Sequence, residues 1–393
     1  MEIISRTRMD TNIQELFLQL VRLGIGHTDR AGFKSQVLGS IDWAALKALA
    51  ERQGLSAVVL DGIDKLNTNN PNFTIMPQML RLEWIGQVLN DETICKAQKA
   101  EAEKMAALFS RNYLRTYVLK GEVVSECYPR PEHRVSVDLD CFLLKEFDDS
   151  GVVHLAKQST NNQRYINKGW DAWSFGNDLI RSKGLQVVEN YYKNSTFYLP
   201  GLTVENHRYL TPFRGNKRLK RLEKLLQSWI REDKELRAFE GTWLYKPPVM
   251  VSALFLIEHA YSHFLHEGLT WRHVLDWTMF SNKHNAEIKW EELEARIDEF
   301  GFRKFYNSYY RLGRYLMGEM NESDLSHQDK LMLEDIWAPL DLHETVRGLR
   351  GKLALTGNTW RARWKYRHFT DMSWISALWI QTKGVLFEKD VVL

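Results

Sequence analysis

The sequence predicts an α+β protein in which a mixed β-sheet core lies between an N-terminal and a C-terminal helical region. Residues 11–90, and those from 216 onward, carry apolar side chains at helical spacing. Short β-prone runs gather in the middle third, where they alternate with helix-like segments. The chain of 393 residues exceeds one ordinary core. We therefore expect three parts, with boundaries at 1–95, 96–215 and 216–393.

The individual elements follow from apolar period, turn residues and helix formers. Helices are expected at residues 16–23, 42–54, 77–89, 92–115, 122–127, 151–167, 171–183, 249–266 and 269–280. Strands are expected at residues 117–119, 134–144, 185–189, 195–199 and 202–207. From residue 216 to the end the pattern is helical, and its last part is charged and rich in Trp.

Composition excludes several classes of protein. Hydrophobic residues make up 44% and charged residues 26%, as in a soluble globular protein, and the net charge of +3 is too small to dictate a polyanionic partner. No segment has the apolar length of a membrane span, and the N-terminus lacks the apolar stretch of a signal peptide. The three cysteines are far apart and form no zinc or disulfide spacing. We therefore expect a cytoplasmic protein.

Two aspartates interrupt the apolar strand predicted at 134–144. Asp138 and Asp140 are two residues apart, so their carboxylates should project from one face of the strand. Two like charges so close repel each other, and a divalent cation such as Mg²⁺ between them removes the repulsion. The alternative is an edge strand whose aspartates face solvent without a ligand. Apolar neighbours on both sides of the pair favour a metal site.

Glu205 adds a third acid on another predicted strand, with apolar and β-branched neighbours. Taken alone, it reads as a surface residue beside a hairpin. Together with Asp138 and Asp140 it becomes the candidate third metal ligand. Two ions at a shared carboxylate would clamp the attacking and leaving oxygens of a phosphoryl transfer.

A turn before the aspartates offers candidate phosphate contacts. Lys120 and Gly121 stand where a strand should end and a helix begin, and a glycine there lets phosphate approach backbone N–H groups. Arg134 and Ser136 lie near the aspartates in the sequence and could bind phosphate oxygens. Turn geometry and ordinary loop chemistry are the alternatives for these four residues.

Three further clusters are less specific. His259 and His263 are four residues apart on a predicted helix with Asp276 nearby, a spacing that fits a metal, a substrate pocket or a helix–helix contact. The basic run 214–221 could meet a triphosphate or nucleic acid, or form a solvated helix start. In 360–367, Trp and Arg alternate, which suits base stacking or simple packing of the Trp faces.

Three segments together resemble a known family. Residues 119–121, 134–140 and 204–207 look like those of the bacterial family of uncharacterised nucleotidyltransferases, in the DNA polymerase β-like nucleotidyltransferase superfamily. Residues 41–50 and 259–276 resemble the family's flanking helical segments.

The resemblance implies roles for single positions. Asp138 and Asp140 match the superfamily's metal-binding pair, Glu205 its third carboxylate and Gly121 the glycine of its phosphate-binding turn. Four further residues match family positions that have no assigned step: Lys120, Arg134, Ser136 and His207. Glu122 departs from the superfamily's usual Gly or Ser and would repel phosphate if it faced inward, and the spacing from Gly121 to Asp138 is longer than in minimal enzymes.

We therefore expect a nucleotidyltransferase that moves a nucleoside monophosphate from an NTP to an acceptor hydroxyl and releases pyrophosphate. Two Mg²⁺ ions, with Mn²⁺ as a substitute, would be held by Asp138, Asp140 and Glu205. The acceptor would be a small molecule, a protein side chain or an RNA end. We expect it to bind in a substrate pocket, a less specific prediction than the metal site, formed by His207, His259, His263 and Asp276.

Two alternatives of other classes stay open at this point. One is a non-catalytic nucleotide-binding regulatory protein, such as a partner in a toxin–antitoxin pair, which the odd residue Glu122 favours. The other is a nucleic-acid-binding module that uses the basic run 214–221.

Overall fold

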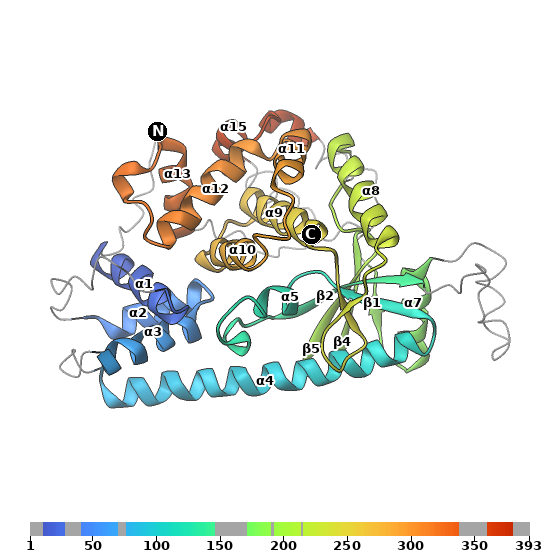
Figure 1. Ribbon diagram of the computed structural model, residues 1–393, viewed down its shortest axis with the longest axis horizontal. Coiled ribbons are helices and arrows are strands. Elements are labelled where there is room, and N and C mark those ends of the chain that lie inside the picture. Colours follow the sequence, from blue (N-terminus) through green and yellow to red (C-terminus); the bar gives the residue numbers. More distant parts are fainter. Residues whose placement is uncertain are drawn as a thin grey trace.

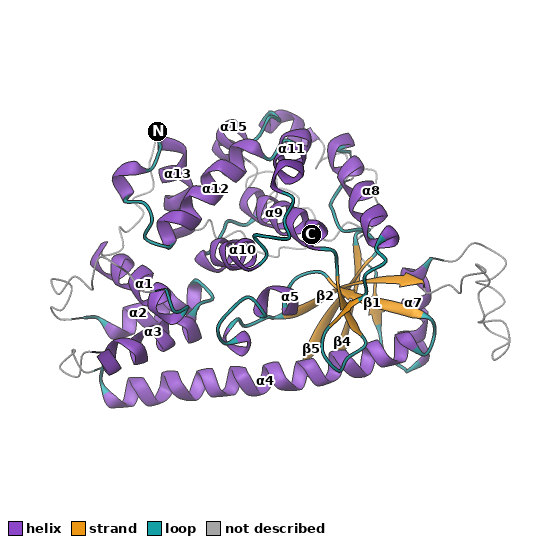
Figure 2. Ribbon diagram, in the orientation of Figure 1, coloured by secondary structure: helices purple, strands orange, loops and turns teal. Residues whose placement is uncertain are grey.

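The computed structural model describes residues 11–27, 41–69, 76–145, 171–189, 192–213, 215–337 and 360–379. Within these ranges a seven-stranded mixed sheet is accompanied by many helices (Figure 2). The α+β class and the mixed sheet are thus confirmed. No helix in the described ranges has the length and apolarity needed to cross a bilayer.

The first helices form a small cluster before the sheet. They are α1 (Thr11–Gly24), α2 (Trp43–Arg52) and α3 (Ser56–Asn69). Asp42 caps α2, because its carboxylate accepts a hydrogen bond from the Ala45 amide at 2.9 Å. The cluster buries an apolar face that includes Leu20 and Val58.

One long helix, α4 (Gln78–Ser110), replaces the two helices expected at 77–89 and 92–115. The expected break was wrong because Asn90 and Asp91 are weak helix formers rather than helix breakers. With 33 residues, α4 is about 50 Å long. Figure 1 shows it running beneath both the first helices and the sheet. The boundary expected after residue 95 falls within this helix.

The sheet has the strand order β3-β4-β5-β2-β1-β7-β6. Its strands are β1 (Leu114–Val118), β2 (Asp138–Lys145), β3 (Val187–Val188), β4 (Asn194–Leu199), β5 (Leu202–His207), β6 (Arg237–Ala238) and β7 (Leu244–Lys246). β2 pairs antiparallel with β1 and parallel with β5, so it lies at the centre of the sheet. The strands expected at 195–199 and 202–207 are confirmed, while β2 begins at Asp138 rather than at residue 134.

Two strands lie where only helices were expected. β6 and β7 follow α8 (Lys217–Glu232) and extend the sheet beyond β1, with β7 parallel to β1. The expectation of helix throughout this region was wrong because strands of two or three residues carry no readable period. The helix expected at 171–183 is α7 (Ala172–Ser182). The helix expected at 151–167 lies outside the described residues.

Helices from different parts of the chain contact opposite faces of the sheet. α7 packs closely on β2, because a Cβ on Gly176 would lie 2.2 Å from the Leu143 side chain. On the other face, α9 (Val249–His266) brings Phe255 against the His207 ring of β5, with 6.5 Å between ring centroids. The even-numbered residues of β2, Asp138 and Asp140 among them, therefore face α9.

The C-terminal helices build the layer that includes α9. They are α10 (Trp271–Lys283), α11 (Trp290–Phe300), α12 (Arg303–Leu316), α13 (His327–Trp337) and α15 (Arg363–Phe369). Their core includes the buried Trp271 and Trp277. Figure 1 shows this layer above the sheet, so the acidic face of β2 looks toward α9 and α10.

Candidate functional site

The register of β2 and β5 brings the three predicted acids together. The two strands run parallel, with Asp138 opposite Thr203, Asp140 opposite Glu205 and Phe142 opposite His207. Side chains at opposed positions share one face of the sheet, so the three acids and His207 project from the same face. Ligand atoms of Asp140, Glu205 and His207 all lie within 4.8 Å of one another.

Asp140 is the buried centre of this group, with only 3% of its side chain exposed. Its Oδ2 lies 2.9 Å from the Lys120 ammonium, and its Oδ1 lies 2.9 Å from Nε2 of His207. Burial alone would raise the pKa of Asp140, but the charge of Lys120 and the bond from His207 hold it far below its usual value. Asp140 is therefore a permanent carboxylate that requires a positive partner.

Asp138, Asp140 and Glu205, together with His207, form what we call the acidic group. Asp138 and Glu205 lie on its more open side. Burial, and then the neighbouring charge of Asp140, raise the pKa of Asp138 above its usual value. Glu205 is 34% exposed, and its Oε2 accepts a hydrogen bond from Asn194 at 2.6 Å. A cation at this face would lower the pKa of Asp138 again, because it would offset the repulsion between the two aspartates.

The donor set fits a divalent cation. Carboxylate oxygens are the ligands that Mg²⁺ and Mn²⁺ prefer, and an imidazole nitrogen suits other transition ions. The Lys120 ammonium already supplies one positive charge to the buried Asp140 carboxylate, at 2.9 Å from Oδ2. The attraction of Asp140 and Asp138 outweighs burial and raises the pKa of Lys120, so that cation is permanent.

The turn between β1 and β2 depends on a glycine. Gly121 has φ +60° and ψ −102°, a conformation that L-residues rarely adopt, and a Cβ on it would lie 3.2 Å from Oγ of Ser136. The Ser136 hydroxyl donates to the Asp138 carbonyl at 2.9 Å. Ser136 thus joins the Gly121 turn to the start of β2, and a role of these residues in phosphate binding stays a prediction.

The carboxylate of Glu122, which follows the Gly121 turn, is paired with a lysine. Its Oε2 lies 3.0 Å from Nζ of Lys99 on α4. The carboxylate that departs from the family's pattern is therefore engaged with α4. This contact weakens the argument from Glu122 for a non-catalytic protein, since that argument needed its carboxylate to face phosphate.

Arg134 and Asp276 were predicted for separate parts of the site, and the structure pairs them with each other. Nη2 of Arg134 lies 2.6 Å from Oδ2 of Asp276, and its Nε donates to Oδ1 at 3.1 Å. The Tyr128 hydroxyl donates to the same Oδ1 at 2.8 Å. Both charged side chains are buried. This bidentate pair joins the loop before β2 to α10.

The predicted histidines divide between the acidic group and its surroundings. His259 joins the group through Lys120, whose Nζ lies 3.2 Å from its Nε2. His263 lies one helical turn further along α9, and its Nδ1 lies 2.7 Å from Oε2 of Glu267. His207 binds Asp140 directly, which is a closer role than the substrate-pocket role that the sequence suggested. Asn194 was missed, because an isolated Asn at a strand start carries no signal.

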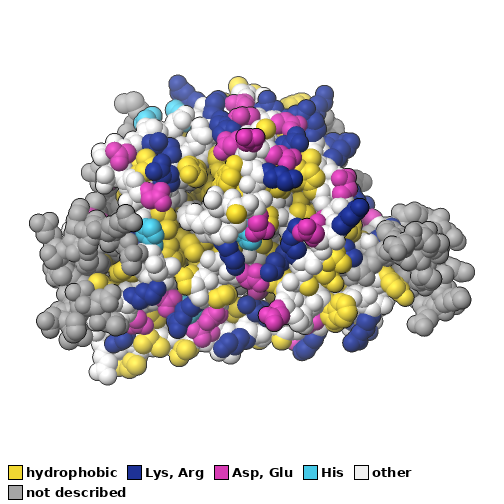
Figure 3. All heavy atoms as spheres, in the orientation of Figure 1, with side chains coloured by type: hydrophobic (Ala, Val, Ile, Leu, Met, Phe, Trp, Pro, Cys, Tyr) yellow, Lys and Arg dark blue, Asp and Glu magenta, His cyan; other side chains and the backbone are white. Residues whose placement is uncertain are grey.

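The two basic segments engage acidic and aromatic neighbours. On α8, Arg218 lies 3.4 Å from Asp371 and Arg221 lies 3.8 Å from Glu299. Lys365 of the Trp-rich segment is buried beside Asp335 at 2.7 Å. Figure 3 shows Lys and Arg interspersed with Asp and Glu over the face that it displays. This mixture favours a solvated helix start for the described part of 214–221, and packing for 360–367, over a nucleic-acid surface.

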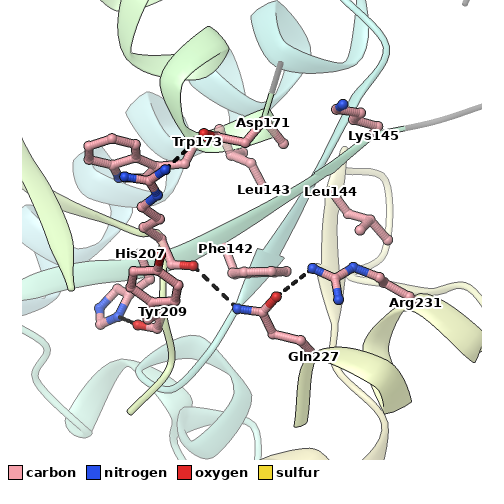
Figure 4. A pocket seen from close by; sticks show the side chains of 12 residues that line it. Phe142, Leu143, Leu144, Lys145, Asp171, Trp173, His207, Tyr209, Gln227 and Arg231 are labelled. Atoms are coloured by element: carbon pink, nitrogen blue, oxygen red, sulfur yellow. Dashed lines mark hydrogen bonds and ion pairs between the residues drawn. The ribbon is translucent and has the colours of Figure 1, made fainter. Parts of the chain in front are cut away.

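A cavity of about 540 Å³ adjoins the acidic group where β2 and β5 end. Its lining includes Phe142, His207 and Tyr209 from the sheet side and Arg231 from α8. At one wall the guanidinium carbon of Arg208 lies 4.9 Å from the centroid of the Trp173 ring. Figure 4 shows Trp173 and Tyr209 on one side of the cavity and Arg231 on the other. His207 belongs both to this cavity and to the acidic group, so the two are neighbours.

Comparison with known proteins identifies the family of the chain. The model of a family described as uncharacterised nucleotidyltransferases matches residues 39–318, which include β1 to β7 and the whole acidic group. No curated protein and no solved structure matches the chain. Since the match covers well over half of its length, the chain belongs to the family of uncharacterised nucleotidyltransferases.

Proposed function

We propose that the protein is a metal-dependent nucleotidyltransferase that moves a nucleoside monophosphate from an NTP to an acceptor hydroxyl, with release of pyrophosphate. The observation that carries the proposal is the parallel register of β2 and β5, which places Asp138, Asp140 and Glu205 on one face of the sheet. Family membership supports the reaction class.

The acids would hold Mg²⁺, with two ions and Mn²⁺ as a substitute. Bound there, the metal supplies charge neutralisation at the transferred phosphate and activation of the acceptor hydroxyl. Asp140 stays ionised because Lys120 and His207 stabilise its charge. Glu205 has 34% of its side chain accessible against 3% for Asp140, so of these two it is better placed to accept the acceptor's proton.

The nucleotide would lie on the Lys120 side of the acids. Lys120 is a permanent cation 2.9 Å from Asp140, and Gly121 and Ser136 form the turn beside it. Arg134 takes no direct part in this proposal, because Asp276 occupies two of its donor nitrogens. Its role is to fix the loop that leads into β2.

The acceptor would enter from the cavity beside His207. Cationic and aromatic side chains, Arg208, Arg231 and Trp173 among them, contribute to its lining. Such a lining suits an acceptor that carries negative charge or a planar ring. A small molecule, a protein side chain and an RNA end all remain candidate acceptors.

Transfer of label from α-³²P-labelled NTPs into cell lysate tests the proposal. Wild type should transfer label in a Mg²⁺-dependent reaction, and Asp138→Asn should abolish the transfer while the protein stays folded. Asp178→Asn is the matched control, because Asp178 is an exposed acid of α7 that pairs with Arg181. Equal transfer by wild type and Asp138→Asn would show that the acids are not catalytic.

A further inference from the structure

Three imidazoles follow one another across α9 and α10, next to the acidic group. The ring centroids of His259 and His263 are 4.3 Å apart, and those of His263 and His273 are 5.2 Å apart. Lys120 connects this imidazole row to Asp140, because its Nζ lies 3.2 Å from His259 and 2.9 Å from Asp140. The row thus starts one side chain away from the proposed metal ligands.

The row brings together side chains that would repel one another if all of them were protonated. Burial, and then the charge of Lys120, hold the pKa of His259 well below its usual value. Burial, and then His263, do the same for the pKa of His273. Since Lys120 keeps its proton, the neutral His259 accepts a hydrogen bond from it. The two end members of the row are therefore neutral in this state.

The charged groups that face the row are mostly cationic. Lys193 acts on His259, and Arg272 and Arg134 act on His273, each disfavouring a further proton. The carboxylate of Glu267 contacts the middle member of the row through Nδ1 of His263. Positive charge thus predominates around the row, with Glu267 on His263 and Asp276 on Arg134 as its nearest carboxylates.

Arg272 adds a donor that the described structure leaves unused. Its Nη1 donates to the Val135 carbonyl at 3.3 Å. Its Nε is buried and has no hydrogen-bond partner among the described residues. A buried N–H without a partner costs free energy, and an anion that reached it would recover that cost. Arg272 precedes His273 at the start of α10, and its charge contributes to the lowered pKa of His273.

We propose that the imidazole row, together with Lys120 and Arg272, binds the β- and γ-phosphates of the NTP, which become the leaving pyrophosphate. This inference rests on the proposed function, and it assigns the histidines to the nucleotide rather than to the acceptor. The α-phosphate would then lie at the acids, and the rest of the triphosphate would extend from Lys120 along α9 and α10.

A polyanion in this place explains why the histidines are close together. Each phosphate oxygen accepts hydrogen bonds from imidazole and ammonium groups and offsets their mutual repulsion. His259 would take up a proton when the anion binds, whereas His273 would donate through Nε2, because its Nδ1 accepts a hydrogen bond from the Thr270 amide at 3.1 Å. A row that served only to pack α9 against α10 would bind no anion and take up no proton.

Titration calorimetry with inorganic pyrophosphate and Mg²⁺ tests the inference, in buffers of different ionisation enthalpy so that proton uptake is measured. Wild type should bind pyrophosphate with proton uptake. His259→Gln and His273→Gln should each weaken binding about tenfold, and His259→Gln should also reduce the uptake. His284→Gln is the matched control, because His284 ends α10 and pairs with Glu287 away from the row. Unchanged affinity in both row variants would overturn the inference.

A second variant keeps the test decisive if a row variant does not fold. Arg272→Gln removes the unused donor from a half-buried side chain, and circular dichroism checks its fold. It should also weaken pyrophosphate binding, and wild-type affinity would count against the inference. Pyrophosphate binding needs no acceptor, so its failure differs from a failure of the transferase. Pyrophosphate binding without label transfer would refute only the proposed function. Label transfer together with unchanged pyrophosphate affinity in the row variants would refute only the role of the imidazole row.

Discussion

The buried pair of Arg134 and Asp276 gives the sharpest prediction, because the sequence and the structure assign these residues different roles. As a phosphate ligand, Arg134 would matter for the KM of the NTP. As the partner of Asp276, it would matter for folding. Arg134→Met keeps most of the side-chain volume and removes the guanidinium. It leaves the Asp276 carboxylate, 9% exposed, with the Tyr128 hydroxyl as its remaining hydrogen-bond donor among the described residues.

The expected cost follows from the geometry. Removing one partner of a buried, hydrogen-bonded ion pair costs about 3–5 kcal/mol, because the other charge stays buried without compensation. Replacing both partners by apolar residues is often close to neutral. Arg134→Met/Asp276→Leu should therefore be clearly more stable than the sum of the two single changes predicts, with a coupling energy of about 2 kcal/mol or more.

Urea unfolding of the four proteins of this double-mutant cycle measures the coupling, and label transfer at varied NTP concentration measures the KM. We expect a large loss of stability in Arg134→Met and its partial recovery in the double variant. The KM of the folded fraction should change little. A stability loss below about 1 kcal/mol, together with a raised KM, would refute the structural role and restore the phosphate role.

Three further changes test other parts of the structure. Asp140→Asn should abolish Mn²⁺ binding followed by electron paramagnetic resonance, since it removes the buried carboxylate. Gly121→Ala should cost about 1–3 kcal/mol in urea unfolding, because it forces a side chain into a strained conformation. Burial lowers the pKa of His133, but its bonds to Asp61 at 2.6 Å and Glu92 at 2.8 Å outweigh burial and raise that pKa above 6.5. This stability is complete below pH 6.5 and is lost as pH rises through the folded pKa, so wild type should lose its advantage over His133→Gln in that window.

The central strands could be predicted because their signals are local. Asp138 and Asp140 stand two apart in an apolar run, and Glu205 stands in a β-branched run that follows a turn. β6 and β7 could not be predicted, because two or three residues hold no period and β7 depends on pairing with the distant β1. The continuity of α4 was missed for a different reason. Residues that are weak helix formers in isolation are tolerated inside a helix of this length.

The acids of the site could be predicted from the sequence, whereas the side chains that pair with the charged residues could not. A period of two and a family resemblance point to the carboxylates, yet neither says which cation faces them. Arg134 and Asp276 are 142 residues apart, and Asp140 and His207 are 67 apart. Pairs at such separations are set by how helices dock on the sheet. Arg134 was therefore predicted to bind phosphate, because the sequence shows that the residue is charged but not that it pairs with Asp276.

The loop between the Gly121 turn and β2 explains how distant helices determine the position of the acids. His133 bonds to Asp61 of α3 and Glu92 of α4, and Arg134 pairs with Asp276 of α10. Residues 131–136 are thus fixed from both helical regions before β2 begins. A fragment limited to residues 96–215 would lose all three of these carboxylates and leave two buried side chains without their partners. We expect such a fragment to lose its fold at the start of β2, so the two helical regions belong to the machinery that positions the acids.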